Sequence, residues 1–355
     1  MTRNKRFFVT LTAAFLLVVC SLIIGLTPIP FVSWQPGQTI DVFGSDNNGR
    51  LVQVEGIKTY DTTGELIVPT VSVTSSQTFL SLPQAVISYF KKDSSVLPRD
   101  YVYPLEPSKS GKDTKNRLED ERNKQMSDSQ DAALVAALSL AGQPVQQTVK
   151  VKRVSSSGPA ADKLNAGDTV RSLNGIEVKT KTDSQAIIKG LRPGDELEIA
   201  LTRQGEALTV KISTVAGNEN PQAARIGAEF EDSYQHPASA KYRINKDVTG
   251  PSAGLLFALG IYDSITPEDI IAGRSISGTG KISPSGDVRA VGGIRQKIFA
   301  AESAGAEYFL VPAGNCADID TETSMKLIKV SKLDDAVSSL KLLEDPNNLE
   351  KVPTC

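Results

Sequence analysis

The feature that most constrains this chain is an uncharged, mostly apolar run near its N-terminus. The run covers residues 7–26 and follows a basic flank in residues 3–6. A helix needs about twenty such residues to cross a bilayer, and a positively charged flank remains in the cytoplasm. We therefore expect a cytoplasmic tip over residues 1–6 and a transmembrane anchor over residues 7–27. Everything that follows the anchor is expected outside the cytoplasm.

A cleaved signal peptide is the competing interpretation of the same segment. Its apolar region would be shorter, however, and no small-x-small cleavage pattern precedes Pro28-Ile29-Pro30. We therefore favour an uncleaved anchor. The expected location is the cell membrane, with a single pass and the folded part of the chain on the extracytoplasmic side.

Composition limits the classes of partner and cofactor. The chain has 355 residues, of which 40% are hydrophobic and 23% are charged, so it can form more than one core. A net charge of −2 predicts no binding to nucleic acid. The three cysteines lack a C-x-x-C spacing, so we expect no metal site, and we expect no cofactor. A disulfide would persist outside the cytoplasm, and we hypothesise one between Cys316 and Cys355.

The segment after the anchor predicts a mixture of strands and helices. Short apolar runs separated by turn residues predict antiparallel strands at residues 39–43, 51–54 and 65–73. Residues 105–125 are nearly all polar and are interpreted as an exposed linker. Beyond a cap at Ser127 or Asp128, apolar residues recur at helical spacing up to Gly142. This spacing predicts a helix that packs on a core.

Residues 145–215 have a pattern of their own. Strands are predicted at residues 149–154, 167–170, 173–178, 197–203 and 207–212, with a short helix ending at Leu164 and a longer one at 183–189. The stretch GPAADKLNAGDTVRSLNGIEV at residues 158–178 resembles a bacterial PDZ domain. Such a module usually binds a peptide tail by strand addition, in a groove between an edge strand and a helix. A rigid spacer with an unused groove is the alternative.

Scarce residue types narrow the choice of catalytic groups. His236 is the only histidine, it precedes a proline, and no G-x-S-x-G elbow is present to use it, so we expect an ordinary surface histidine. Ser252 lies in Gly-Pro-Ser-Ala-Gly, and Lys297 lies in an apolar helical setting further along. A lysine can act as a general base once burial has lowered its pKa from about 10.4. Taken alone, the serine is equally explained as a helix cap, and such a lysine is more often solvated.

The residues around the serine predict a loop that receives the substrate. Gly250 and Pro251 let the chain turn ahead of a helix that begins near Ala253. Ser252 would then lie at a helix N-terminus, where backbone N–H groups stabilise a developing oxyanion. Gly254 would leave room for the substrate backbone. These residues, other than the serine itself, are the expected substrate and oxyanion loop.

Three separated motifs carry a second resemblance. GPSAG, TGKI and GDVRAVGGIRQKIFAAESAGAEYFLVP all lie within residues 250–312, in the order and spacing of the Lon-type serine protease domain. The C-terminal part of the chain therefore resembles that family. Position by position, the resemblance implies Ser252 as the nucleophile, Lys297 as the general base, and Thr279 as the hydroxyl that orients the lysine.

Two features depart from the better-known members of that family. An acidic residue often precedes Gly-Pro-Ser, but Thr249 stands here and the nearest preceding carboxylate is Asp247, so carboxylate assistance is left in doubt. The loop at residues 278–281 does not satisfy G-x-x-x-x-G-K-[ST] in any register. With no ATPase module recognised elsewhere, we expect an ATP-independent enzyme.

The two resemblances together predict the organisation of the chain. A strand and a helix that precede the serine loop in Lon-type domains are expected within residues 28–143, and the remainder of the catalytic domain within 217–355. The PDZ-like module at 144–216 would then be an insertion. The resemblance implies an α+β, membrane-anchored Lon-like serine endopeptidase that acts on extracytoplasmic polypeptides, with a hexameric ring as its assembly. A PDZ-centred scaffold or chaperone with a vestigial protease domain is the alternative.

Overall fold

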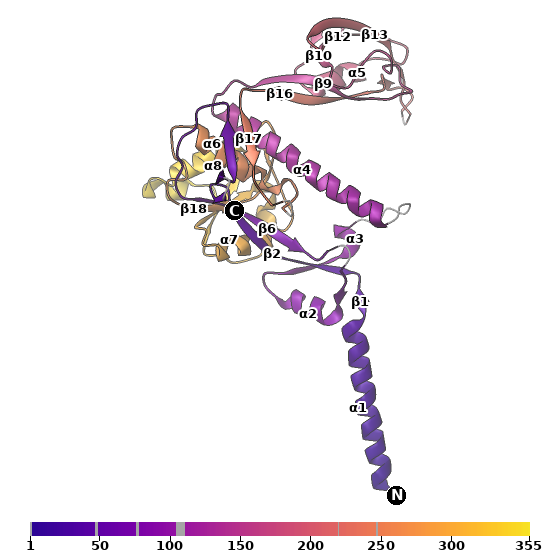
Figure 1. Cartoon of the computed structure of the whole chain (residues 1–355), viewed down its shortest axis with the longest axis vertical. Helices are drawn as coiled ribbons and strands as arrows, with labels where there is room; N and C mark the ends of the chain where they lie inside the picture. The colour runs from indigo at the N-terminus through magenta and orange to yellow at the C-terminus, as the bar shows by residue number, and fades with distance from the viewer. Residues whose placement is uncertain (1, 47–48, 76–77, 104–110, 219, 246–247) are drawn as a thin grey trace. The chain divides into compact units, whose positions relative to one another are not determined.

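The computed structural model describes residues 2–46, 49–75, 78–103, 111–218, 220–245 and 248–355 (Figure 1). The chain contains both helices and strands, which confirms the predicted α+β class. The chain forms two compact units. The larger unit combines Met1–Gly142 with Ala238–Cys355, and the smaller unit is Gln143–Pro237. The smaller unit is therefore an insertion between two halves of the larger one.

The larger unit is built on a six-stranded mixed sheet. Its strand order is β22-β21-β18-β6-β2-β8, with parallel pairing from β22 to β6 and antiparallel pairing from β6 to β8. The strands are β2 (Phe31–Asp41), β6 (Glu65–Val73), β8 (Ser95–Pro98), β18 (Ser275–Gly278), β21 (Tyr308–Pro312) and β22 (Lys326–Val330). The parallel strands bring residues from both halves of the unit into one sheet, since β6 pairs directly with β18.

Four helices pack around this sheet. They are α4 (Gly111–Leu140), α6 (Gly254–Ile265), α7 (Ile294–Ser303) and α8 (Leu333–Leu342). Helix α6 is buried along almost its whole length, whereas α7 packs on β2 and β6. A helix that is apolar all round must be covered on every side, and α4 and α8 cover α6. The core thus lies around α6, whose N-terminus carries the predicted nucleophile.

Short elements complete the larger unit. They are α1 (Thr2–Leu26), β1 (Pro28–Ile29), β3 (Ser45–Asp46), β4 (Gly49–Arg50), β5 (Val52–Glu55), β7 (Leu80–Ser81), α2 (Leu82–Phe90), α3 (Arg99–Val102), β17 (Ser239–Tyr242), η1 (Pro251–Ala253), β19 (Lys281–Ile282), β20 (Val288–Arg289), η2 (Ala313–Asp318) and η3 (Pro346–Lys351). Strand β5 pairs with β17 from the other half of the chain. By length and composition, Phe7–Leu26 in α1 is able to cross a membrane, and its side chains are largely exposed.

The structure corrects the prediction for the polar segment of this unit. The polar segment 105–125 was expected to be a linker, yet from residue 111 onwards it belongs to α4. The segment is rich in Lys, Arg, Glu and Gln, which are good helix formers, and polarity alone does not distinguish a solvated helix from a linker. The part of the predicted linker before residue 111 includes residues 104–110, which lie outside the described residues.

The smaller unit is a sheet with strand order β13-β12-β10-β9-β16 and one main helix, α5 (Lys181–Lys189). The strands are β9 (Gln146–Val154), β10 (Thr169–Leu173), β11 (Ile176–Glu177), β12 (Glu196–Arg203), β13 (Glu206–Ser213), β14 (Val215–Ala216), β15 (Ala224–Arg225) and β16 (Ala228–Gln235). Alternate residues of the long strands, such as Leu197, Ile199 and Leu201, are buried in a core of the unit's own. The predicted short helix before Leu164 consists of turns instead.

The pairing of β16 shows that the insertion ends later in the chain than predicted, at Pro237 instead of residue 216. Residues 217 onwards were predicted to belong to the catalytic part, but β16 pairs with the full length of β9 in the antiparallel sense. This eight-residue ladder pairs the backbone groups of β16 that face β9, so residues up to Pro237 fold with the smaller unit. Sequence periodicity identified β9 but not its partner.

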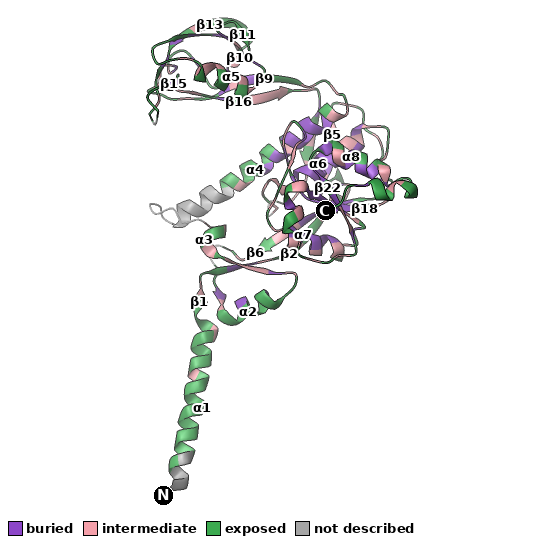
Figure 2. Cartoon of the chain, turned by 180° about the vertical axis from the view of Figure 1, so that it is seen from behind, coloured by how far each residue is buried: buried purple, intermediate pink, exposed green. Residues whose placement is uncertain are grey.

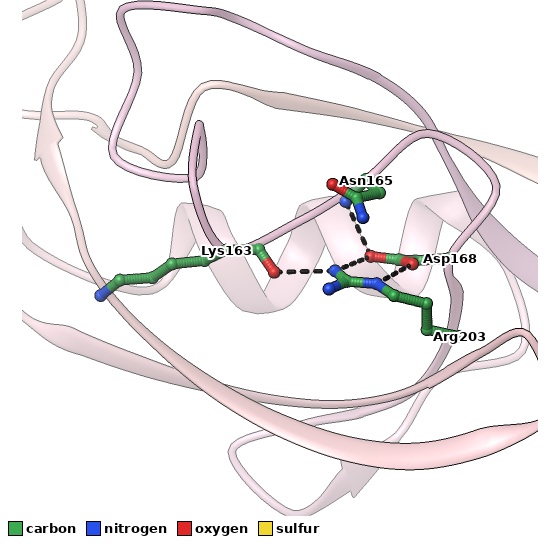
Figure 3. Close-up of polar contacts among 4 residues, drawn as sticks. All are labelled: Lys163, Asn165, Asp168 and Arg203. Carbon is green, nitrogen blue, oxygen red and sulfur yellow. Dashed lines mark hydrogen bonds and ion pairs between the residues drawn. The ribbon is translucent and has the colours of Figure 1, made fainter.

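A buried ion pair fixes the corner of the smaller unit (Figure 3). The Asp168 carboxylate is 2% exposed and accepts hydrogen bonds from Arg203 Nε at 2.8 Å and Arg203 Nη2 at 2.7 Å. The backbone N–H of Asn165 donates to the same carboxylate, and Arg203 also donates to the carbonyl of Lys163. Burial alone would raise the pKa of Asp168, but these hydrogen bonds and the Arg203 charge outweigh it and hold the pKa below its usual range.

Candidate active site

Ser252 lies at the start of the buried helix. Gly250 adopts a φ of 95°, which favours glycine, and the chain then enters the short η1 turn that leads directly into α6. The carbonyl oxygen of Ser252 accepts the backbone N–H of Gly280 at 2.8 Å. The serine is therefore held by a turn on one side and by the loop after β18 on the other.

The structure corrects the role that was predicted for Gly254. Its space is occupied by the protein itself, because a Cβ atom at this position would lie 2.5 Å from Ser129 Oγ and 2.9 Å from Ile282 Cγ2. Gly254 is buried and allows α6 to approach α4 and β19 closely. It leaves no room for a substrate backbone. The other predicted loop residues, Gly250, Pro251 and Ala253, line the same groove as Ser252.

Thr279 connects the serine segment to the lysine. It follows β18 and is 1% exposed. Its hydroxyl donates to the carbonyl oxygen of Ser252 at 2.9 Å and accepts a hydrogen bond from Lys297 Nζ at 3.0 Å. Because the hydroxyl has one proton and two lone pairs, this geometry uses its donor on one neighbour and an acceptor site on the other. The side chain therefore fixes the position of the lysine amine relative to the serine backbone.

Lys297 lies in the first turn of α7 and is 3% exposed. Burial lowers the pKa of its amine from 10.5 to about 7, because the charged form is removed from water. Gly293, with a φ of 71°, precedes the helix, and a Cβ atom there would lie 2.8 Å from Val71 Cγ2. The Gly-Gly pair thus lets the start of α7 approach β6 closely enough to bury the lysine.

A groove of about 910 Å³ contains Ser252 and Lys297. The opposite wall of the groove was not predicted, and it comes from the first half of the larger unit. Its residues are Trp34, Pro36, Gly37 and Gln38 of β2 and Val68 to Val73 of β6. No local motif marks these residues. They are found only through the β6–β18 pairing, which places β6 beside the strand that leads to Thr279.

The remaining predicted residues have separate positions. Cys316 and Cys355 are joined by a disulfide with their Cα atoms 5.1 Å apart, which ties the C-terminus to the segment after β21. His236 belongs to the smaller unit and is not among the residues that line the groove. Asp247 lies outside the described residues. In the described part of the chain, no cluster of three His, Cys, Asp or Glu residues is placed to hold a metal ion.

Comparison with protein families assigns both parts of the chain. Residues 203–342 match the C-terminal proteolytic domain of Lon protease (S16), and residues 120–214 match a PDZ domain. The first match includes Ser252, Thr279 and Lys297, which the fold brings together. The chain carries a Lon-type proteolytic domain and a PDZ domain.

Individual relatives of the Lon-type domain are moderately similar. Lon protease 1 of Myxococcus xanthus is 26% identical over 172 residues, which are 46% of this chain and 21% of that protein. Lon protease of Phenylobacterium zucineum is 31% identical over 158 residues, which are 41% of this chain and 19% of that protein. The chain therefore spans about a fifth of the length of these relatives.

The PDZ domain has solved structural neighbours. The PDZ domain of the SdrC-like protein of Listeria innocua is 24% identical, with a TM-score of 0.22. The match covers 23% of this chain and 92% of the Listeria chain. The corresponding domain from Listeria monocytogenes is 23% identical and covers 22% of this chain and 85% of its own, with a TM-score of 0.20.

The PDZ domain has a groove of about 770 Å³. Residues of α5 and of the edge strand β16 line it, among them Ile188, Lys189 and Phe230. Arg153 and Arg225 also line it. An edge strand opposite a helix leaves unpaired backbone groups beside apolar side chains, the arrangement by which an extended peptide is added to a sheet.

Proposed function

We propose that the chain is an ATP-independent serine endopeptidase that uses Ser252 as the nucleophile and Lys297 as the general base. The observation that carries the proposal is the buried amine of Lys297, hydrogen-bonded to Thr279, whose hydroxyl is bonded to the backbone of Ser252. A lysine in this setting has a pKa of about 7 and is substantially neutral at physiological pH.

The proposed reaction follows from these groups. Ser252 Oγ attacks the carbonyl carbon of the scissile bond while the neutral amine of Lys297 takes its proton. Backbone N–H groups at the start of the helical segment that contains Ser252 stabilise the oxyanion. The Lys297 ammonium then donates the proton to the leaving amine, and an acyl-enzyme forms. Water, deprotonated by the same lysine, releases the acid product.

The proposed location is the extracytoplasmic side of the cell membrane, with α1 as the tether. Support comes from the apolar span Phe7–Leu26, from the basic residues before it, and from the disulfide between Cys316 and Cys355, since disulfides persist in oxidising compartments. We propose that the substrates are polypeptides and that the PDZ groove recruits their exposed tails. The Lon-type domain further supports a hexameric assembly as part of this proposal.

A PDZ-centred scaffold is the competing function. Burial of Lys297 with a single hydroxyl partner argues against it, because a buried amine destabilises the fold and serves no purpose in a vestigial site. The deciding experiment compares the purified full chain with Ser252→Ala and with Lys297→Met, which cannot accept a proton. We expect cleavage of an unfolded protein substrate to be lost in both variants with the fold intact. Undiminished cleavage in either variant would overturn the assignment, and inactivity of the parent chain would favour the scaffold.

The dependence on ATP is tested with the same preparation. We expect equal turnover of an unfolded substrate with and without ATP and Mg²⁺. Stimulation by ATP in a preparation that the Ser252→Ala control shows to be free of other proteases would contradict this part of the proposal.

A further inference from the structure

Helix α2 has an inverted pattern of burial. A helix on the surface of a soluble protein normally turns its apolar side chains inward and its polar ones outward. In α2 the two buried residues are Ala85 and Ser88. The large apolar residues are exposed instead, with Leu82 at 44%, Val86 at 46%, Ile87 at 60%, Tyr89 at 72% and Phe90 at 79%. Figure 2 shows α2 coloured mostly as exposed. The helix therefore has an apolar surface that the described residues of the larger unit leave exposed.

These exposed residues form one continuous face. At about 100° of rotation per residue, Tyr89, Leu82, Val86, Phe90 and Ile87 follow one another around the helix and span roughly 160°. The one polar residue near the start of the helix is used in its cap, since the backbone N–H of Ser81 donates to Gln84 Oε1 at 2.9 Å. We call the five exposed residues the α2 apolar face.

The position of α2 is fixed relative to the end of α1. Strand β1, which follows α1, pairs with β7, which precedes α2, in the register Pro28↔Ser81 and Ile29↔Leu80. Paired strands lie about 4.8 Å apart. The first residue of α2 thus lies next to the point where the chain leaves α1.

We propose that the α2 apolar face lies in the outer headgroup layer of the membrane that α1 crosses. This inference rests on the proposed membrane tether, because the β1–β7 pairing places α2 at the boundary only if α1 spans the bilayer. Interfacial helices of this kind bury an apolar face about 5–10 Å into the lipid. The larger unit would then be held at the membrane by two contacts instead of one, which restricts its rotation about α1.

The charges around α2 fit a lipid surface. Lys91 and Lys92 follow the helix directly and are both exposed. A lysine near an anionic membrane contributes about 1 kcal/mol of attraction. Asp93, the nearest acidic residue, is half-buried and accepts a hydrogen bond from the Ser94 hydroxyl at 3.0 Å. At the end of the helix, Tyr89 is of a type that concentrates at membrane interfaces, and Phe90 is of a type found on the apolar face of interfacial helices.

Nitroxide labels on the full-length chain in phosphatidylcholine–phosphatidylglycerol vesicles test the inference. The label is attached to Ile87→Cys or Phe90→Cys in a Cys20→Ala background, and to Leu349→Cys as the matched control, since Leu349 is an exposed apolar residue of the same unit at 36%. Oxygen concentrates in lipid, whereas a nickel chelate remains in water. We expect the nickel accessibility at positions 87 and 90 to be roughly threefold or more below that at 349, with higher oxygen accessibility.

The labels also separate this inference from the tether on which it rests. A label on Cys20 of the otherwise unaltered chain reports on α1 itself. Lipid exposure at position 20 together with water exposure at 87 and 90 would overturn the docking of α2 alone, whereas water exposure at position 20 would overturn the tether and the docking together. Protection at 87 and 90 that disappears when the chain is diluted with lipid would assign the face to a second copy and would also overturn the inference.

Discussion

At the scale of single residues, Lys297 determines when the site can act. Its amine is a base only when neutral, and burial lowers its pKa to about 7. We therefore expect kcat/KM to rise about tenfold per pH unit below pH 7 and to level off above it. A pH–rate profile on a short fluorogenic peptide measures this. Lys329→Met, which removes an exposed lysine of β22, should leave the profile unchanged. A profile that rises only near pH 10 would show that the amine is not desolvated.

The same burial predicts a stability cost. The unfolded chain binds the Lys297 proton up to pH 10.5 and the folded chain only up to about 7, so the free energy of unfolding should increase with pH across this interval. Lys297→Met removes the buried charge and should stabilise the larger unit by roughly 4 kcal/mol at pH 7, with the gain shrinking towards pH 10.5. Trp34, the only tryptophan, reports the denaturant-induced unfolding. A destabilised Met variant would contradict the assignment of a costly buried amine.

Sequence reasoning placed the reacting residues but not their surroundings. Ser252, Thr279 and Lys297 were identified from motifs, and the fold brings them to one site. Gly254 was misinterpreted, because a glycine that accommodates a neighbouring helix and one that accommodates a ligand have the same sequence signal. The wall formed by Trp34 and β6 was missed because it depends on a pairing between strands about 210 residues apart, which no local pattern encodes.

At the scale of elements, the Asp168–Arg203 pair should stabilise the β10–β12 corner of the smaller unit. Arg203→Met leaves a carboxylate that is 2% exposed without its partner, and we expect a loss of about 2–3 kcal/mol. Lys211→Met breaks a pair whose side chains are 59% and 58% exposed and should change stability by less than about 1 kcal/mol. Amide hydrogen exchange of β10 and β12 in the full chain measures the change in stability for each of the two variants.

The pH dependence of this pair gives a second check. The folded-state pKa of Asp168 is depressed, so its contribution is fully present above the unfolded value of about 3.9 and is lost as the pH falls through the folded value. The difference in the free energy of unfolding between the parent chain and Arg203→Met should therefore be constant near neutral pH and should diminish in acid. A difference that persists unchanged below this range would mean that Arg203 acts through packing of its side chain instead.

Some helices and strands were predicted accurately from the sequence pattern, and others were not. β6 was predicted with its observed bounds, because a buried strand between turn residues has an unambiguous signal. The polar part of α4 and the whole of β16 were assigned wrongly. The burial pattern of β16 does not alternate regularly between exposed and buried positions, and its eight-residue pairing with β9 decides where it folds.

At the scale of the whole molecule, the insertion of one unit into the other predicts that binding and chemistry are separable. The PDZ domain has its own core and its own groove, and the described residues that line the Ser252 groove all belong to the larger unit. Replacing residues 143–237 by a short Gly/Ser linker should therefore leave cleavage of a short peptide within about twofold of the parent, because no groove residue is lost.

Cleavage of a protein substrate with a free C-terminal tail should respond differently to the same deletion. Tethering a tail to the enzyme raises the local substrate concentration to roughly millimolar, so at low substrate concentration its loss should reduce kcat/KM by about tenfold or more. Ile188→Asp, which replaces an apolar side chain on the helix side of the PDZ groove by a charged one, serves as the matched variant and should reproduce the effect with the insertion present. The parent chain, the deletion and Ile188→Asp could instead cleave tailed and tailless substrates at equal rates. In that case the PDZ groove would have no part in substrate selection, and substrate choice would depend on the groove around Ser252 alone.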